Sequence, residues 1–180
     1  NALSRTRLGD ANVTSAESDF LLRLAALSLS FVGFSAIVVT LRGALGGKLS
    51  DRHLRLVRLY IEGGFVVTAL GLVPALLNLL HVPESVTWSV SSAAAALIFT
   101  FVLVAQFRRR RAIEGRFPPW VVIIFAISVV VVIGLWLNVA GIPFRSGIGP
   151  YAVALTWALG VFGFIFVRTI EIFLHRDPPN

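Results

Sequence analysis

The residues whose types and spacing could do chemistry begin at Ser50, in the stretch SDRHLRLVRLYIEGGF that leads into the second apolar segment of the chain. Four charged side chains there share one face of a helix, at successive spacings of four, three and four residues: Asp51, Arg55, Arg58 and Glu62. Glu62 lies about one turn inside the apolar segment, where a carboxylate is costly and often functional. The pattern predicts an Arg58–Glu62 pair that fixes the depth of the helix or, alternatively, a site for an ion, a proton or a ligand. Gly63 and Gly64 would let a backbone or a ligand approach closely.

A second charged group lies at the end of the last apolar segment. Arg168, Glu171 and His175 are separated by three and four residues and again share one helix face. If the second and fifth apolar segments are neighbouring helices, their charges can join in an ion-pair network. The candidate cluster comprises Arg55, Arg58, Glu62, Arg168 and Glu171. We expect this cluster to act as a structural clamp, with a gate or a binding site for an anionic headgroup as the functional alternatives.

The strongest run of charge is Arg108, Arg109, Arg110 and Arg111, directly after the third apolar segment. Such a run is typical of a stop-transfer signal, and each basic residue near an anionic lipid surface contributes about 1 kcal/mol of attraction. A docking surface for an acidic partner is the alternative. The net charge of +7 would suggest nucleic acid in a soluble protein. Here the arginines flank apolar segments, so we expect a lipid bilayer and no nucleic acid as the partner.

Other catalytic chemistry has little support in the residue types. Cysteine is absent, which excludes disulfides and thiolate metal sites from this chain. His53, His81 and His175 lie outside the middle of the apolar segments, so we expect neither a histidine metal cluster nor a haem between helices. We therefore predict no catalytic residues and no metal, and the chain specifies no cofactor, although a pigment- or quinone-associated subunit stays open.

The elements that must position these side chains are apolar helices. Hydrophobic residues make up 57% of the 180 and charged residues only 14%, whereas soluble domains carry about 25% charged residues. Five segments reach the length of about 20 apolar residues that a membrane helix needs, at 20–41, 59–80, 88–107, 120–140 and 151–174. Ser18 or Asp19 can cap the first of them. We predict an all-α, polytopic membrane bundle of five transmembrane helices over residues 20–176, with tails at 1–19 and 177–180.

The basic residues also predict an orientation. Twelve of the sixteen Lys and Arg lie in the loops after the first and third segments or beside the C-terminus, and four lie on the other side. Because cytoplasmic loops carry the excess of basic residues, we expect the N-terminus outside and the C-terminus in the cytoplasm. Trp88, Trp136 and Tyr151 then fall at outer helix ends, where aromatic rings gather at headgroup level.

Small residues indicate close packing of helices. Ala26, Ser30 and Gly33 form a stripe on the first segment, and a second stripe on the fifth contains Ala152, Thr156, Gly160 and Gly163. Lipid supplies little hydrophobic drive between helices, so small residues that let backbones approach are favoured at contacts within a chain or with partner subunits. Pro74 should bend the second helix and leave one carbonyl without its helical partner. Trp157 lies deep enough that its N–H needs a partner.

Residues 27–42, 55–65 and 72–77 resemble the first hairpin of a group of small bacterial multi-pass inner-membrane proteins with no known activity. The resemblance implies a helical inner-membrane protein and supplies no functional residues. We therefore expect a non-enzymatic accessory or scaffold subunit of a membrane complex, or a homo-oligomer. A small ion or solute channel or transporter that uses the Arg/Glu cluster is the alternative.

Overall fold

Five α-helices make up the described part of the computed structural model, which covers the backbone of residues 2–44, 51–111, 118–142 and 147–174 and the side chains of residues 16–41, 58–108, 118–142 and 147–168. The helices are α1 (Ala2–Ala44), α2 (Asp51–Leu79), α3 (Glu84–Arg111), α4 (Pro119–Ala140) and α5 (Ile148–Leu174). Each contains an apolar stretch of 21 to 26 residues that is long enough to cross a membrane. The described residues contain no strand, and the prediction of an all-helical chain with five helices long and apolar enough to span a membrane is confirmed.

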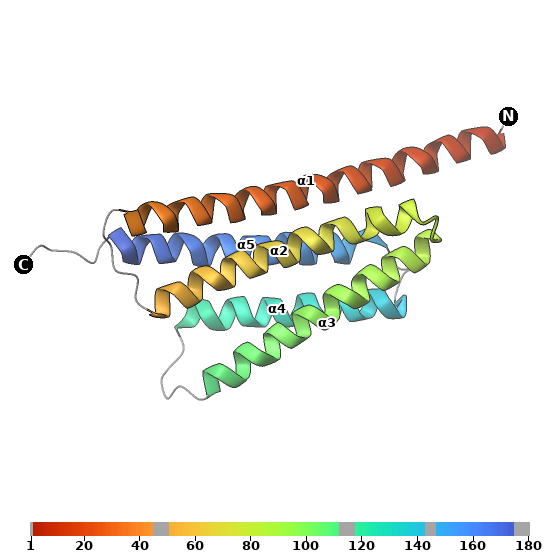
Figure 1. Cartoon of the computed structure of the whole chain (residues 1–180). Coiled ribbons are helices and arrows are strands. Elements are labelled where there is room, and N and C mark those ends of the chain that lie inside the picture. The colour runs from red at the N-terminus through yellow and green to blue at the C-terminus, as the bar shows by residue number, and fades with distance from the viewer. Residues whose placement is uncertain (1, 45–50, 112–117, 143–146, 175–180) are drawn as a thin grey trace, which may run out of the picture.

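Helix α1 is longer than the sequence predicted. It runs without a break over 43 residues, about 64 Å at the usual rise per residue, and its first turns extend beyond the other four helices (Figure 1). Ser18 and Asp19 lie inside the helix, so their predicted role as N-caps is wrong. The reason is local, because no proline interrupts residues 2–17 and polar residues alone do not end a helix.

The turns after α2 and α4 are built alike. Each contains one residue with a left-handed backbone, His81 with φ 57° and Gly141 with φ 68°. In both turns the next amide donates to the carbonyl five residues earlier, at 3.1 Å in the first turn and 3.0 Å in the second. This closure satisfies carbonyls that the helix end would leave unpaired. Both turns lie at one end of the bundle, here called the His81 end, and the opposite end is called the Arg58 end (Figure 1).

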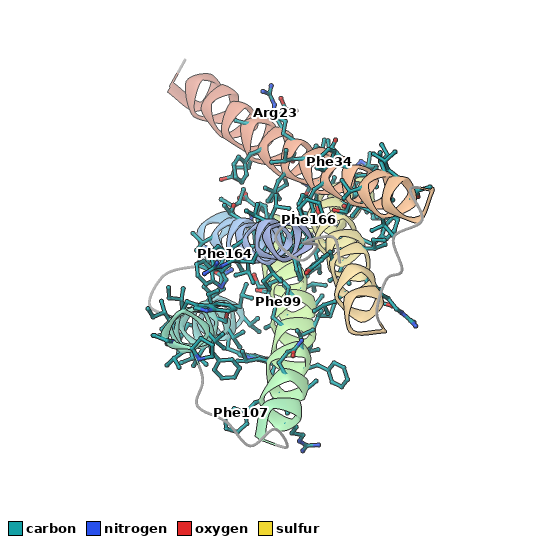
Figure 2. The ribbon with its side chains drawn as sticks, turned by 90° about the vertical axis from the view of Figure 1, so that its left-hand side faces the viewer. Arg23, Phe34, Phe99, Phe107, Phe164 and Phe166 are labelled. Carbon is teal, nitrogen blue, oxygen red and sulfur yellow. The ribbon has the colours of Figure 1, made fainter. Side chains whose placement is uncertain are left out.

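Helix α5 is the centre of the bundle. It contacts each of the other four helices, while α1, α2, α3 and α4 pack in chain order around it. Among the described residues α1 contacts neither α3 nor α4, so the ring around α5 stays open between α1 and α4 (Figure 2). One face of α5 is consequently not covered by the described residues of this chain.

The buried core is small and the outer surface is apolar. Leu135, Tyr151 and Leu155 are fully enclosed where α4 and α5 meet the rest of the bundle. Large apolar side chains cover the outside, and Phe101 and Val130 are 75% and 67% exposed. Large exposed apolar patches mark a surface that contacts membrane or protein. Five apolar helices with such a surface suggest a multi-pass membrane protein.

Candidate functional site

The two charged residues singled out on α2 lie together in the structure. Arg58 Nε donates to Glu62 Oε1 at 2.5 Å, across one turn of the helix. Their side chains are 80% and 57% exposed. The geometry is that of an ion pair on the surface of a helix, where solvent or headgroups reach both groups.

The pair faces outward from the bundle. Phe65, Leu72 and Leu76 continue its exposed side along α2, while Tyr60 and Val67 are buried on the opposite side. A path through the interior of one chain would therefore not meet Glu62. This position does not favour the channel alternative.

The rest of the predicted charged cluster is only partly described. The side chains of Arg55 and Glu171 lie outside the described residues. Arg168 is exposed on α5 at the Arg58 end. The condition for the network is met, since α2 and α5 are neighbours. The network itself stays a prediction.

The arginine run after the third apolar segment is also only partly described. Helix α3 continues through all four of its residues to Arg111. Arg108 is exposed, and the side chains of Arg109, Arg110 and Arg111 lie outside the described residues. Contact of this run with anionic lipid or with an acidic partner stays a prediction.

The paired glycines beside Glu62 serve helix packing. A Cβ at Gly63 would overlap the ring of Phe162 on α5, and a Cβ at Gly64 would overlap Val32 on α1. Farther along α2, a Cβ at Gly71 would lie 3.1 Å from the Cβ of Ala25. The close approach that these glycines permit is thus occupied by neighbouring helices, and no ligand is needed to explain it.

The carbonyl freed by Pro74 has a partner that the sequence did not identify. Proline has no N–H, so the carbonyl four residues earlier, that of Leu70, lacks its helical donor. Tyr151 Oη donates to this carbonyl at 2.5 Å. Tyr151 is fully buried and its ring lies 6.2 Å from that of Trp88, which is also buried. Both rings lie near the starts of their helices, as the sequence indicates, but each faces the interior of the bundle. Their depth at headgroup level stays a prediction.

Asn138 joins three helices at the His81 end. Its Nδ2 donates to Ser92 Oγ of α3 at 2.8 Å and to the carbonyl of Gly147 at 2.9 Å, and its Oδ1 accepts from the amide of Gly147 at 3.1 Å. These bonds hold the end of α4 to α3 and to the residue before α5. The sequence signal was available, since Asn138 is the one amide side chain in a helix whose other residues, apart from Ser128, are apolar or aromatic.

Two indole N–H groups form hydrogen bonds between α4 and its neighbouring helices. Trp157 Nε1 of α5 donates to Ser128 Oγ at 3.0 Å, which supplies the partner predicted for this N–H. Trp136 Nε1 donates to Thr100 Oγ1 of α3 at 3.2 Å. These two hydrogen bonds add to the apolar packing of Val132 and Leu135, which holds α4 against the bundle.

Two stripes of small residues face outward. The outer α1 face comprises Asp19, Arg23, Ala26, Ser30, Gly33 and Ile37, and the outer α5 face comprises Gly149, Val153, Thr156, Gly160, Phe164 and Val167, all of them exposed. A Cβ built on Gly33 or on Gly160 would meet nothing within 4 Å. Packing among the described residues does not require these glycines, which makes the two faces candidate interaction surfaces.

Fold and site together define a class of protein, an all-helical bundle compatible with a multi-pass membrane protein. Within the described residues no three His, Asp or Glu side chains are placed to hold a metal ion. Comparison with known proteins found no matching family model, no matching curated protein and no matching solved structure. The resemblance of the first hairpin to small bacterial membrane proteins therefore stays an expectation.

Proposed function

We propose that this chain is a multi-pass protein of the bacterial inner membrane that catalyses no reaction and acts through assembly. It serves as an accessory or scaffold subunit of a membrane complex or forms a homo-oligomer. The distribution of basic residues supports an N-terminus outside and a C-terminus in the cytoplasm, with the Arg58 end toward the cytoplasm.

The observation that supports assembly is the difference between two sets of glycines. Gly64 and Gly71 accommodate α1 within the chain, whereas the space around Gly33 and Gly160 is open. Lipid tails cover any apolar surface, and the bulky outer residues of α3 and α4 suit them. A small-residue face offers lipid less area and instead lets a second backbone approach closely, which is how helices associate in membranes.

The position of the outer α5 face adds support. This face lies in the opening between α1 and α4, on the helix that contacts all the others. Thr156 and Gly160 are four residues apart on it, the small-xxx-small spacing of close helix contacts. A helix from a partner placed there would complete the ring around α5.

The test is the mass of the particle taken from its own membrane. Extraction with a lipid-retaining polymer, followed by mass measurement, should give a particle that contains more than one chain. Gly160→Leu should reduce the larger particle, while the control Gly134→Leu, where a Cβ also meets nothing within 4 Å, should preserve it. A particle with a single chain and no co-purifying protein would contradict the proposal.

Labelling of single introduced cysteines tests the orientation, because the chain has no cysteine of its own that would react. We expect Ser85→Cys to react with an impermeant maleimide from the outside of intact cells, because Ser85 is exposed at the His81 end. Lys48→Cys should react only after the membrane is opened. The reverse pattern would overturn the proposed orientation.

A further inference from the structure

An arginine lies on the outside of α1 within its spanning segment. Arg23 is seven residues into the stretch Ala16–Leu41, and its side chain points away from the bundle (Figure 2). Asp19, one turn earlier, is exposed as well. Among the described residues neither side chain makes an ion pair or a hydrogen bond. A charge on the lipid-facing side of a helix is costly, so its position calls for an explanation.

These charges continue into the small-residue stripe. The outer α1 face follows spacings of four, three, four, three and four residues from Asp19 to Ile37, which keeps it on one side of the helix. The buried residues of α1, among them Leu21, Ser28 and Ser35, lie on the other side toward α2. The hydroxyl of Ser30 donates to the carbonyl of Ala26 at 2.9 Å, so it adds no unsatisfied group to the face.

We propose that the outer α1 face binds the same face of a second copy of this chain, in an inference that rests on the proposed assembly function. Two copies inserted in the same direction are related by a two-fold axis along the membrane normal, which places identical faces against each other with their helices parallel. Arg23 of each copy then pairs with Asp19 of the other. The two ion pairs are equivalent by symmetry.

Charge complementarity selects a second copy as the occupant. Asp19 and Arg23 differ in depth by about 6 Å, four residues at 1.5 Å each. Side chains on a helix lean toward its N-terminus, so the long arginine extends toward the depth of the partner's aspartate. A face that carries both signs at this offset is complementary to itself. Because lipid excludes water beside the helix, each pair is attracted more strongly than it would be in water.

The small residues provide the close approach that the ion pairs need. Ala26 and Ser30 have the four-residue spacing of helix pairs that cross at short distance, and Gly33 extends the same side. Leu22 and Leu29, which are exposed beside the stripe, can pack around the contact. The competing explanation is that Arg23 extends to outer headgroups and the stripe faces lipid.

Disulfide cross-linking in native membranes tests the contact. In this cysteine-free chain, Ser30→Cys or Gly33→Cys should give a dimer on oxidation. Two controls are exposed residues on helices that this contact does not involve, Phe65→Cys on α2 and Val130→Cys on α4, and both should give far less dimer.

Charge exchange in the Ser30→Cys background tests the pairing. Asp19→Arg or Arg23→Asp alone should lower the dimer yield about tenfold, the factor that corresponds to 1.4 kcal/mol. The double variant Asp19→Arg/Arg23→Asp should restore it in part, because opposite charges face each other again but the exchanged arginine leans away from the partner's aspartate. The unfolding midpoint of each variant should stay unchanged, since both side chains are exposed.

Three results would overturn the inference, and they separate it from the proposed function. If the charge variants leave cross-linking unchanged, Arg23 interacts with lipid headgroups and the proposed pairing of Arg23 with Asp19 of the other copy is wrong. If Ser30→Cys and Gly33→Cys give no dimer while the native particle still contains several chains, assembly stands and this contact is wrong. A native particle with one chain would contradict both.

Discussion

The inner side of α2 and the outer sides of α1 and α5 use the same residue types in different ways. Along α2, Gly64 and Gly71 bring α1 into contact, and the hydroxyl of Ser28 donates to the carbonyl of Gly64 at 2.9 Å. On the outer faces, Gly33 and Gly160 have open space beside them. Small residues therefore do not mark packing within a chain by themselves. Their meaning depends on which side of the helix they occupy.

The largest effect that the comparison predicts comes from filling the inner contact. Gly64→Leu should disrupt the α1–α2 pair, because even a Cβ would overlap Val32, and overpacking costs about 1–3 kcal/mol or more. Unfolding in mixed detergent micelles measures the loss. Val32→Ala should recover part of it. A Gly64→Leu protein as stable as the Gly134→Leu protein would show that the contact between α1 and α2 is not tightly packed.

A smaller effect is expected from removing the Tyr151 hydroxyl, which donates to the Leu70 carbonyl left without a helical partner by Pro74. Tyr151→Phe should cost about 1–2 kcal/mol of unfolding free energy, because the carbonyl of Leu70 then lacks a donor inside the bundle. In a Pro74→Ala background the amide of residue 74 can donate to that carbonyl, so the same change should cost less. Equal costs in both backgrounds would mean that the two sites are independent.

Filling an outer face should leave folding unchanged. Gly33→Leu has room for its side chain, so we expect the unfolding midpoint of the wild-type protein together with a loss of self-association. Both quantities can be measured on one preparation, with unfolding in detergent and cross-linking in membranes. A drop in stability comparable to that of Gly64→Leu would remove the distinction between the inner and outer faces.

The smallest effect should come from the exposed ion pair. Glu62→Gln removes the negative charge of the pair with Arg58, but both side chains are exposed, and exposed pairs contribute little to stability. We expect no measurable change in the unfolding midpoint and none in the mass of the native particle. Loss of the particle would instead place Glu62 in a contact with a partner.

The sequence predicted the helices well and their faces poorly. Runs of apolar residues between prolines, glycines and charges are enough to locate five helices that are long and apolar enough to span a membrane. The start of α1 was missed because the sequence of a polar helix cannot be told from that of a polar tail when no proline interrupts it. The burial of Tyr151 was missed because an aromatic residue at a helix end suits either headgroups or the interior. Only the arrangement of α2 beside α5 decides between them.

Individual polar contacts were predicted where the chain itself creates the need. Spacing within one helix was enough for the Arg58–Glu62 pair, and the missing N–H of Pro74 was enough for a freed carbonyl. The identity of the donor, Tyr151, depends on residues 81 positions apart. The same limit applied to Asn138, whose partners lie on α3 and before α5. Sequence patterns of this kind predict contacts within one helix. Contacts between helices depend on how the helices are arranged in the bundle.

The most direct test of assembly through the outer faces is photo-cross-linking in native membranes from matched phenylalanine positions. A benzophenone analogue would replace Phe34 beside the outer α1 face, Phe164 on the outer α5 face, and Phe101 on the bulky surface of α3. We expect protein adducts from Phe34 or Phe164 and only lipid adducts from Phe101. Protein adducts from Phe101 alone, or from none of the three, would contradict assembly through the small-residue faces.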